Sequence, residues 1–189
     1  MQIAIWDGDA IVPAYVAMLR GVNVGGNPLK MAWLREACEA LGLREVRTYL
    51  QSGNIVFSSA LGATKLAAML KATIDRQTRL PVPVIIRSGK EMTDVANGNP
   101  FLKRRGIDAS KLHVTFLGDQ PKQPDIARLD KLAGTRDDYL FARREIFLHC
   151  PINYGETKLS NAAIEKVLGV SATTRNWNTV TTLAAMADV

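Results

Sequence analysis

Two groups of glycine, polar and basic residues have the types and spacing needed to bind an anion. The first comprises Gly21–Asn27 and Gln51–Asn54, and the second comprises Ile152–Lys158 and Arg175–Asn178. Phosphate and carboxylate groups bind to backbone N–H groups of glycine-rich loops and helix starts, helped by nearby cations. The candidate ligand-binding residues are Arg20, Asn23, Gly25, Gly26, Lys30, Gln51, Ser52, Asn54, Tyr154, Lys158, Arg175, Asn176, Trp177 and Asn178.

The glycine-rich run Gly21–Gly26 matches neither of the common phosphate-loop motifs. Asn23 stands where the dinucleotide-binding fingerprint has its second glycine. Asn27 and Pro28 stand where a Walker loop requires lysine followed by serine or threonine. A backbone cradle for an anion and a plain tight turn are therefore both compatible with this run.

Nucleophile and metal-ligand patterns do not identify an enzyme. Ser52 has no Gly-x-Ser-x-Gly context, and neither His113 nor His149 can be placed beside it. His149 and Cys150 are neighbours on one predicted strand, so their side chains point to opposite faces and cannot share a metal. We therefore predict no metal and no cofactor.

A short apolar run near the N-terminus is followed by Asp7-Gly8-Asp9. This has the form of the nucleophile motif of dehalogenase-like phosphatases, but the rest of the chain lacks the doubly wound α/β pattern of that class. We interpret residues 1–13 as an N-terminal extension.

The composition is that of a globular protein: 47% of the 189 residues are hydrophobic and 22% are charged. The net charge of +6 is compatible with acidic partners such as nucleotides or nucleic acid, but a merely soluble basic surface is the simpler explanation. Two cysteines are too few for a secreted disulfide framework. We find no apolar run long enough to span a membrane and no signal-peptide core, so we expect a cytoplasmic protein.

Hydrophobic periodicity and turn residues predict the same order of elements twice, strand-helix-strand-strand-helix-strand. This order is typical of a ferredoxin-like unit. We predict an α+β protein with an N-terminal extension (1–13), two such units (14–88 and 111–189) separated by a linker (89–110), and a C-terminal helix. The predicted strands are 15–20, 46–50, 55–57, 82–86, 111–117, 139–142, 146–149 and 172–175, and the helices begin near 28, 64, 124, 160 and 178.

The topology of such a unit decides which loops meet. Two right-handed crossovers give an antiparallel sheet with strand order 4-1-3-2. In the first unit, the loop 21–27 and the turn 51–54 then share one sheet edge. In the second unit, the segments 152–158 and 175–178 share the opposite edge. Two helices start at that second edge, with Asn178 as the expected cap of the last one, and their positive ends would attract an anion.

The chain resembles a bacterial family called "domain of unknown function 1697". The resemblance is carried in order by these segments: Leu19–Gly26, Lys30-Met31, Thr48–Phe57, Asn99–Phe101, Lys158–Asn161 and Thr173–Val180. It implies a two-part α+β fold with ferredoxin-like halves and implies no activity, because a shared fold does not specify a ligand.

The leading hypothesis is a binding module for a phosphate-bearing or otherwise anionic ligand, such as a nucleotide or nucleic acid. One alternative is a metal-independent enzyme acting on an anionic substrate, with Arg20 and Arg175 stabilising negative charge. Another is an interaction protein that forms a homo-oligomer. Base stacking on Tyr15, Tyr49 and Phe57, as in RNA-recognition domains, has weaker support, because the aromatic content is only 6%.

Overall fold

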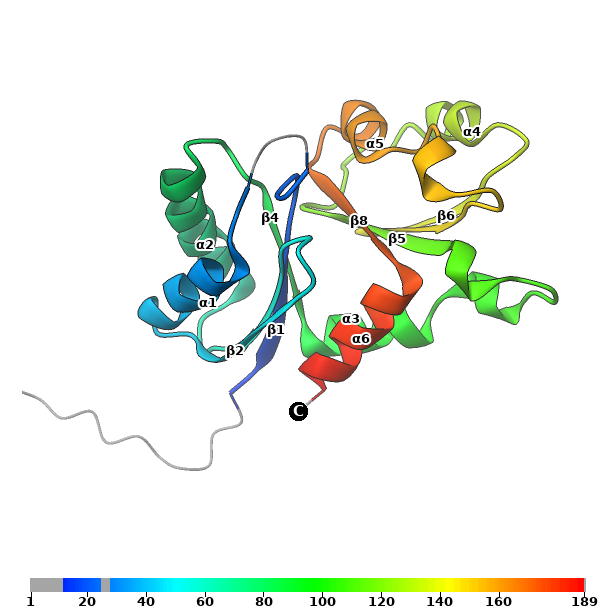
Figure 1. Cartoon of the computed structure of the whole chain (residues 1–189). Helices are drawn as coiled ribbons and strands as arrows, with labels where there is room; N and C mark the ends of the chain where they lie inside the picture. Colours follow the sequence, from blue (N-terminus) through cyan, green and yellow to red (C-terminus); the bar gives the residue numbers. More distant parts are fainter. Residues whose placement is uncertain (1–11, 25–27, 189) are drawn as a thin grey trace, which may run out of the picture.

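The computed structural model describes residues 12–24 and 28–188, and it contains two four-stranded antiparallel sheets. The predicted fold class, two ferredoxin-like units in tandem with a C-terminal helix, is confirmed (Figure 1). Residues 1–11 of the predicted extension lie outside the described residues.

The first sheet has the strand order β2-β3-β1-β4, as expected from two right-handed crossovers. Helices α1 and α2 pack on one face and close a core that includes Leu34, Leu66, Leu70 and Ile74. The elements are β1 (Ala14–Leu19), α1 (Met31–Ala40), β2 (Arg44–Tyr49), β3 (Asn54–Ser58), α2 (Ala63–Thr78) and β4 (Val84–Ser88).

The second sheet repeats this order as β6-β7-β5-β8. Helices α4 and α5 cover one face and bury Leu129, Ile164 and Leu168. The elements are β5 (Leu112–Leu117), α4 (Ile126–Ala133), β6 (Asp138–Ala142), β7 (Glu145–His149), α5 (Asn161–Leu168) and β8 (Ala172–Asn176), with the short 3-10 turn η3 (Tyr154–Glu156) before α5.

A third core joins the two units. Helices α3 (Gly89–Asn97) and α6 (Trp177–Ala187) pack together between the sheets (Figure 1). Their apolar side chains Met92 and Leu183 share one cluster with Val16 of the first sheet and Val114 of the second. The predicted linker therefore contains α3 and two 3-10 turns, η1 (Pro100–Lys103) and η2 (Ala109–Lys111), and contributes to the core.

The start of the last helix corrects one prediction. Asn178 was expected to cap this helix, but Asn176 does so: its Oδ1 accepts a 2.8 Å hydrogen bond from the backbone N–H of Thr179. Strand β8 runs directly into α6, so an extended asparagine at the junction satisfies a free N–H of the first turn. Helix α2, which was predicted to begin near residue 64, begins at Ala63 and has Gly62 at its N-cap.

Among the described residues, no helix combines the length and the apolar character needed to traverse a bilayer.

Candidate functional site

The loop after β1 and the β2–β3 turn lie together, as the predicted topology requires. Asn23 joins them: its Nδ2 donates hydrogen bonds to the carbonyl oxygens of Leu29 (2.9 Å) and Gln51 (2.7 Å). Its Oδ1 accepts the backbone N–H of Leu29 at 2.7 Å. The side chain of Asn23 is thus used to close the loop. Gly25 and Gly26 lie outside the described residues, and Lys30 is exposed just before α1.

The turn itself is tightly built. Gly53 has a φ of +74°, and a Cβ at this position would lie 2.5 Å from Cγ2 of Val22. Ser52 is exposed, whereas Asn54 is completely buried. The Nδ2 of Asn54 donates to the carbonyl of Tyr49 and to the hydroxyl of Ser52. These contacts fix the turn and leave Oδ1 of Asn54 facing the second unit.

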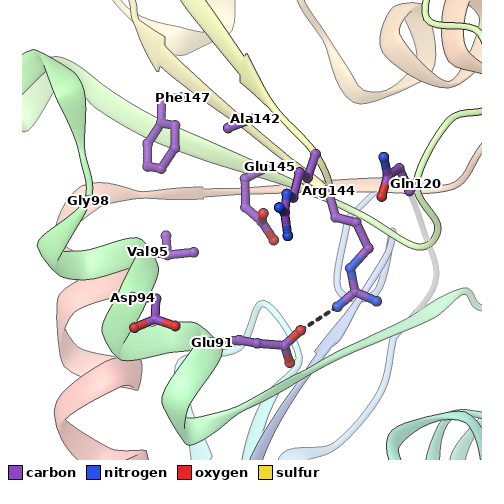
Figure 2. Close-up of a pocket in the computed structure, with 10 residues that line it drawn as sticks. Glu91, Asp94, Val95, Gly98, Gln120, Ala142, Arg144, Glu145 and Phe147 are labelled. Atoms are coloured by element: carbon purple, nitrogen blue, oxygen red, sulfur yellow. Dashed lines mark hydrogen bonds and ion pairs between the residues drawn. The ribbon is translucent and has the colours of Figure 1, made fainter.

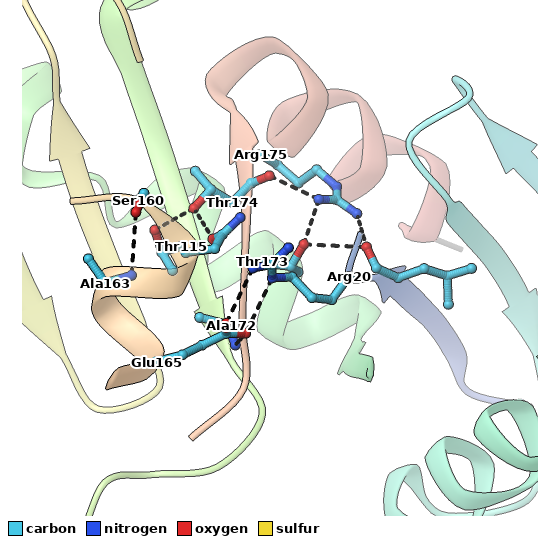
Figure 3. A network of polar contacts seen from close by, with 11 residues as sticks. Arg20, Thr115, Ser160, Ala163, Glu165, Ala172, Thr173, Thr174 and Arg175 are labelled. Carbon is cyan, nitrogen blue, oxygen red and sulfur yellow. Dashed lines mark hydrogen bonds and ion pairs between the residues drawn. The ribbon is translucent and has the colours of Figure 1, made fainter. Parts of the chain in front are cut away.

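Arg175, on β8 of the second unit (Figure 3), reaches across to this turn. Its Nε donates to Oδ1 of Asn54 at 2.6 Å, and its Nη2 donates to the carbonyls of Leu19 (2.9 Å) and Ser52 (3.0 Å). Its Nη1 donates to the hydroxyl of Thr173 and to the carbonyl of Thr174. These five bonds equal the five N–H donors of a guanidinium. The two predicted clusters therefore meet, through a side chain whose donors are already used.

Burial changes the chemistry of this arginine. Arg175 is only 8% exposed, and the loss of solvation lowers the pKa of its guanidinium to about 10. It remains charged at neutral pH, and its contacts with carbonyl and amide oxygens hold the two units together.

A second link between the units is the ion pair of Arg20 and Glu165. Nε and Nη2 of Arg20 each lie 3.3 Å from a carboxylate oxygen of Glu165 on α5. The same carboxylate accepts the backbone N–H of Ala172 at 2.9 Å, at the start of β8 (Figure 3). Arg20 is thus directed to the second unit.

The predicted residues of the second cluster share a sheet edge but not a sheet face. Tyr154 packs in the core beneath α4 and α5 and stacks on His113, with ring centroids 4.8 Å apart. Burial raises the pKa of Tyr154. Trp177 instead packs in the core between the sheets. Lys158 and Asn178 are exposed at this edge.

A cleft that the sequence did not identify lies between α3 and the β6–β7 hairpin (Figure 2). Its volume is about 530 Å³. We call it the α3 cleft, and it is lined by Glu91, Asp94, Val95, Gly98, Gln120, Ala142, Arg143, Arg144, Glu145 and Phe147.

The base of the α3 cleft is apolar. Phe147 and Val95 are 6% and 7% exposed, and Ala142 is partly buried beside them. These side chains belong to the core between the units, so they are held in fixed positions. They give the cleft a rigid apolar surface beneath a charged rim.

Most charges on the rim are paired. Nη2 of Arg144 donates to Oε1 of Glu91 at 2.8 Å, and the other oxygen of Glu91 completes a capping box with Ser88 at the start of α3. Glu145 accepts a 2.7 Å hydrogen bond from Nε of Arg87. For the side chain of Arg143, no hydrogen bond or ion pair occurs within residues 12–24 and 28–188. Arg143 is therefore the unpaired cation of the rim.

Arg87, on β4 of the first unit, holds this rim in place. Besides binding Glu145, its Nη2 donates to the carbonyls of Leu117 (2.8 Å) and Arg144 (3.0 Å). The side chain is 1% exposed, and the loss of solvation lowers the pKa of the guanidinium. The β6–β7 hairpin is thus anchored to β4 of the first unit.

The two thiols offer no activated nucleophile. Burial raises the pKa of Cys38 to about 12 and that of Cys150 to about 11. Within the described parts of the chain, no three His, Cys, Asp or Glu side chains lie close enough to hold a metal ion.

Sequence reasoning missed the α3 cleft for two reasons. Arg143 and Arg144 were not among the candidate binding residues, and the segment 89–110 was predicted to be a linker between the units. The spacing Ser88-x-x-Glu91 is the capping-box signal that marks the start of α3. No local pattern, however, indicates that α3 lies opposite the β6–β7 hairpin.

Comparison with known proteins agrees with this architecture. The structure of the conserved bacterial protein SP0830 from Streptococcus pneumoniae is similar, with a TM-score of 0.74 and 23% sequence identity. The match covers 94% of this chain and 100% of that one, and it supports the fold alone. Among curated proteins, none matches the chain. The family model described as "Protein of unknown function (DUF1697)" matches residues 12–147, more than half of the chain, so the protein belongs to the DUF1697 family.

Proposed function

We propose that this protein is a binding module for a small molecule that carries a phosphate or carboxylate group, and that the ligand occupies the α3 cleft. One observation carries the proposal. Arg143 stands on the rim of an apolar cleft with no acidic partner among the described residues, while the neighbouring acidic groups are paired.

The dimensions of the cleft support a small ligand. Small-molecule sites commonly have volumes of roughly 300–1,000 Å³, lie between domains, and combine apolar walls with a few polar groups. The α3 cleft, at about 530 Å³ between the two units, has these properties. Val95, Ala142 and Phe147 would bury the apolar part of the ligand.

The charges of the rim support an anionic group on that ligand. Glu91 is neutralised by Arg144 and Glu145 by Arg87, so the cation of Arg143 is in excess. Arg144 donates through Nη2 alone to the described residues, which leaves its other nitrogens for a ligand oxygen. Guanidinium groups form strong paired hydrogen bonds with carboxylates and phosphates.

The same charges favour a small anion over nucleic acid. Three carboxylates line the cleft beside two arginines, and a polyanion that spans the cleft would approach all three. A single phosphate or carboxylate can contact Arg143 and Arg144 without doing so. If a nucleic acid were bound instead, its affinity would fall steeply with increasing salt concentration.

Two-dimensional ¹H–¹⁵N NMR titrations with hexanoate and hexyl phosphate test the proposal. We expect shifts of the amide signals of Val95, Ala142 and Phe147. Because Arg143 has a φ of +55°, the variant Arg143→Asn removes the charge and keeps a residue that tolerates this backbone. Its affinity should fall about tenfold, the size of one charge-assisted hydrogen bond.

Arg128→Ala is the matched control, because Arg128 is exposed on α4 and its loss changes the net charge equally. This variant should bind both probes as the wild type does. Absence of amide shifts around the cleft with both probes would refute the proposal.

A further inference from the structure

We infer that the ligand of the α3 cleft is amphoteric: it carries a protonated amine that binds Asp94, at the end of the cleft away from its anionic group. This inference rests on the proposed function and specifies the chemical class of the ligand. The inference follows from a difference among the three described carboxylates that line the cleft. They differ in how easily a ligand can displace their present partners.

Two of these carboxylates are held by partners within the protein that a ligand cannot displace without a large cost. Glu145 binds the buried Arg87, with side chains 16% and 1% exposed. Glu91 accepts hydrogen bonds from Arg144, from the backbone of Ser88 and from the hydroxyl of Ser88. Displacing either would leave a buried guanidinium or a helix start unsatisfied, which is costly.

Asp94 is different, because its partner is an exposed lysine. Its Oδ2 lies 2.8 Å from Nζ of Lys90, one turn away on α3, and the two side chains are 62% and 82% exposed. Exposed pairs of this kind contribute little to stability. A ligand ammonium held over the apolar base of the cleft can therefore replace Lys90 at little cost.

The positions of the charges define the shape of the ligand. In Figure 2, Asp94, Val95 and Gly98 lie on one side of the cleft, Arg144 and Gln120 on the other, and Glu145 between them. Glu91 is the partner of Arg144, and Asp94 lies three residues further along α3. This spacing corresponds to roughly 4.5 Å of rise along the helix.

A short apolar chain with an amine at one end and an anion at the other matches this order of groups. Its methylene groups would pack on Val95, Ala142 and Phe147. An ω-amino carboxylate, or the phosphate ester of an amino alcohol, has this constitution.

The test compares ω-amino carboxylates of three to six carbons with the carboxylates of equal carbon number. We expect at least one amphoteric probe to bind the wild-type protein about tenfold more tightly than its matched carboxylate. The variant Asp94→Asn should abolish this preference, so that each amphoteric probe binds it no more tightly than the matched carboxylate does. Glu36→Gln, which removes an exposed carboxylate from α1, should preserve the preference.

The outcomes separate the two proposals. Equal affinity for every matched pair would overturn the amphoteric ligand and leave the anion site standing. A preference that survives in Asp94→Asn would also overturn it, because the amine would then bind elsewhere. Failure of every probe, amphoteric or not, would overturn the anion site and this inference together.

Discussion

Arg87 and Arg175 occupy equivalent positions in the two units, and each crosses to the other unit. Arg87 pairs in register with Val16 of β1, and Arg175 pairs with Val114 of β5. Arg87 binds the carbonyl of Leu117 and the β6–β7 turn, while Arg175 binds the carbonyl of Leu19 and the β2–β3 turn. The two contacts are related by an approximate twofold arrangement of the units.

The two contacts differ in one respect. Arg87 meets the carboxylate of Glu145 at the first residue of β7, whereas Arg175 meets the neutral amide of Asn54 at the first residue of β3. The interface is therefore electrically asymmetric. The α3 cleft forms beside the contact that contains the carboxylate.

The first prediction concerns Arg175→Met, which keeps much of the side-chain volume and removes all five hydrogen bonds. We expect the free energy of unfolding to fall by about 2–4 kcal/mol, because Oδ1 of Asn54 and the carbonyls of Leu19 and Ser52 lose a buried donor. Urea denaturation measures this loss. An unchanged unfolding midpoint would show that these hydrogen bonds do not hold the two units together.

The second prediction concerns the pair formed by Arg87 and Glu145. Arg87→Met and Glu145→Gln should each destabilise the protein, and the double variant should lose less than the sum of the two. We expect a coupling energy of about 1–3 kcal/mol, since the ion pair is largely buried. Additive effects in the double-mutant cycle would contradict a direct interaction.

The third prediction separates backbone strain from steric overlap in the β2–β3 turn. Gly53→Ala combines a positive φ with a Cβ only 2.5 Å from Val22. Gly42→Ala is the control, because its φ is +80° and nothing lies within 4 Å of its Cβ. Strain alone costs about 1–3 kcal/mol. Thermal unfolding should therefore show a larger loss for Gly53→Ala, and equal losses would disprove the overlap.

The fourth prediction concerns the buried thiol of Cys38 and the dependence of stability on pH. Folding raises the pKa of Cys38 from 9.0 to about 12, because burial disfavours the thiolate. The unfolded chain therefore releases this proton first. The stability that the neutral thiol contributes is complete below pH 9 and is lost as the pH rises toward 12.

Two measurements check this prediction. Cys38→Ala should flatten the decline of the unfolding free energy between pH 8 and about 10, relative to the wild type. At pH 8, a thiol-specific reagent should label Cys38 slowly in the native protein and rapidly in urea. Fast labelling of the native protein would show that the thiol is accessible.

The secondary-structure elements and their order within each unit follow from local patterns of residues. Apolar residues at helical or alternating spacing marked strands and helices to within a few residues, as for α5 and β5. The handedness of the crossovers then predicted that the loop of Asn23 meets the turn of Ser52, which the contact between Asn23 and Gln51 confirms.

The partners of the polar residues, in contrast, depend on contacts between the two units that form when the chain folds. Side chains alternate between the two faces of a sheet, so the strand pattern of β8 places Arg175 on the face opposite to that of its chain neighbours. The pattern cannot show that the other unit supplies Asn54 as its partner. The α3 cleft likewise depends on α3 lying opposite the β6–β7 hairpin. Local sequence patterns encode which side chains must be buried, whereas the contacts between distant segments determine what buries them, because many surfaces can satisfy the same hydrophobic pattern.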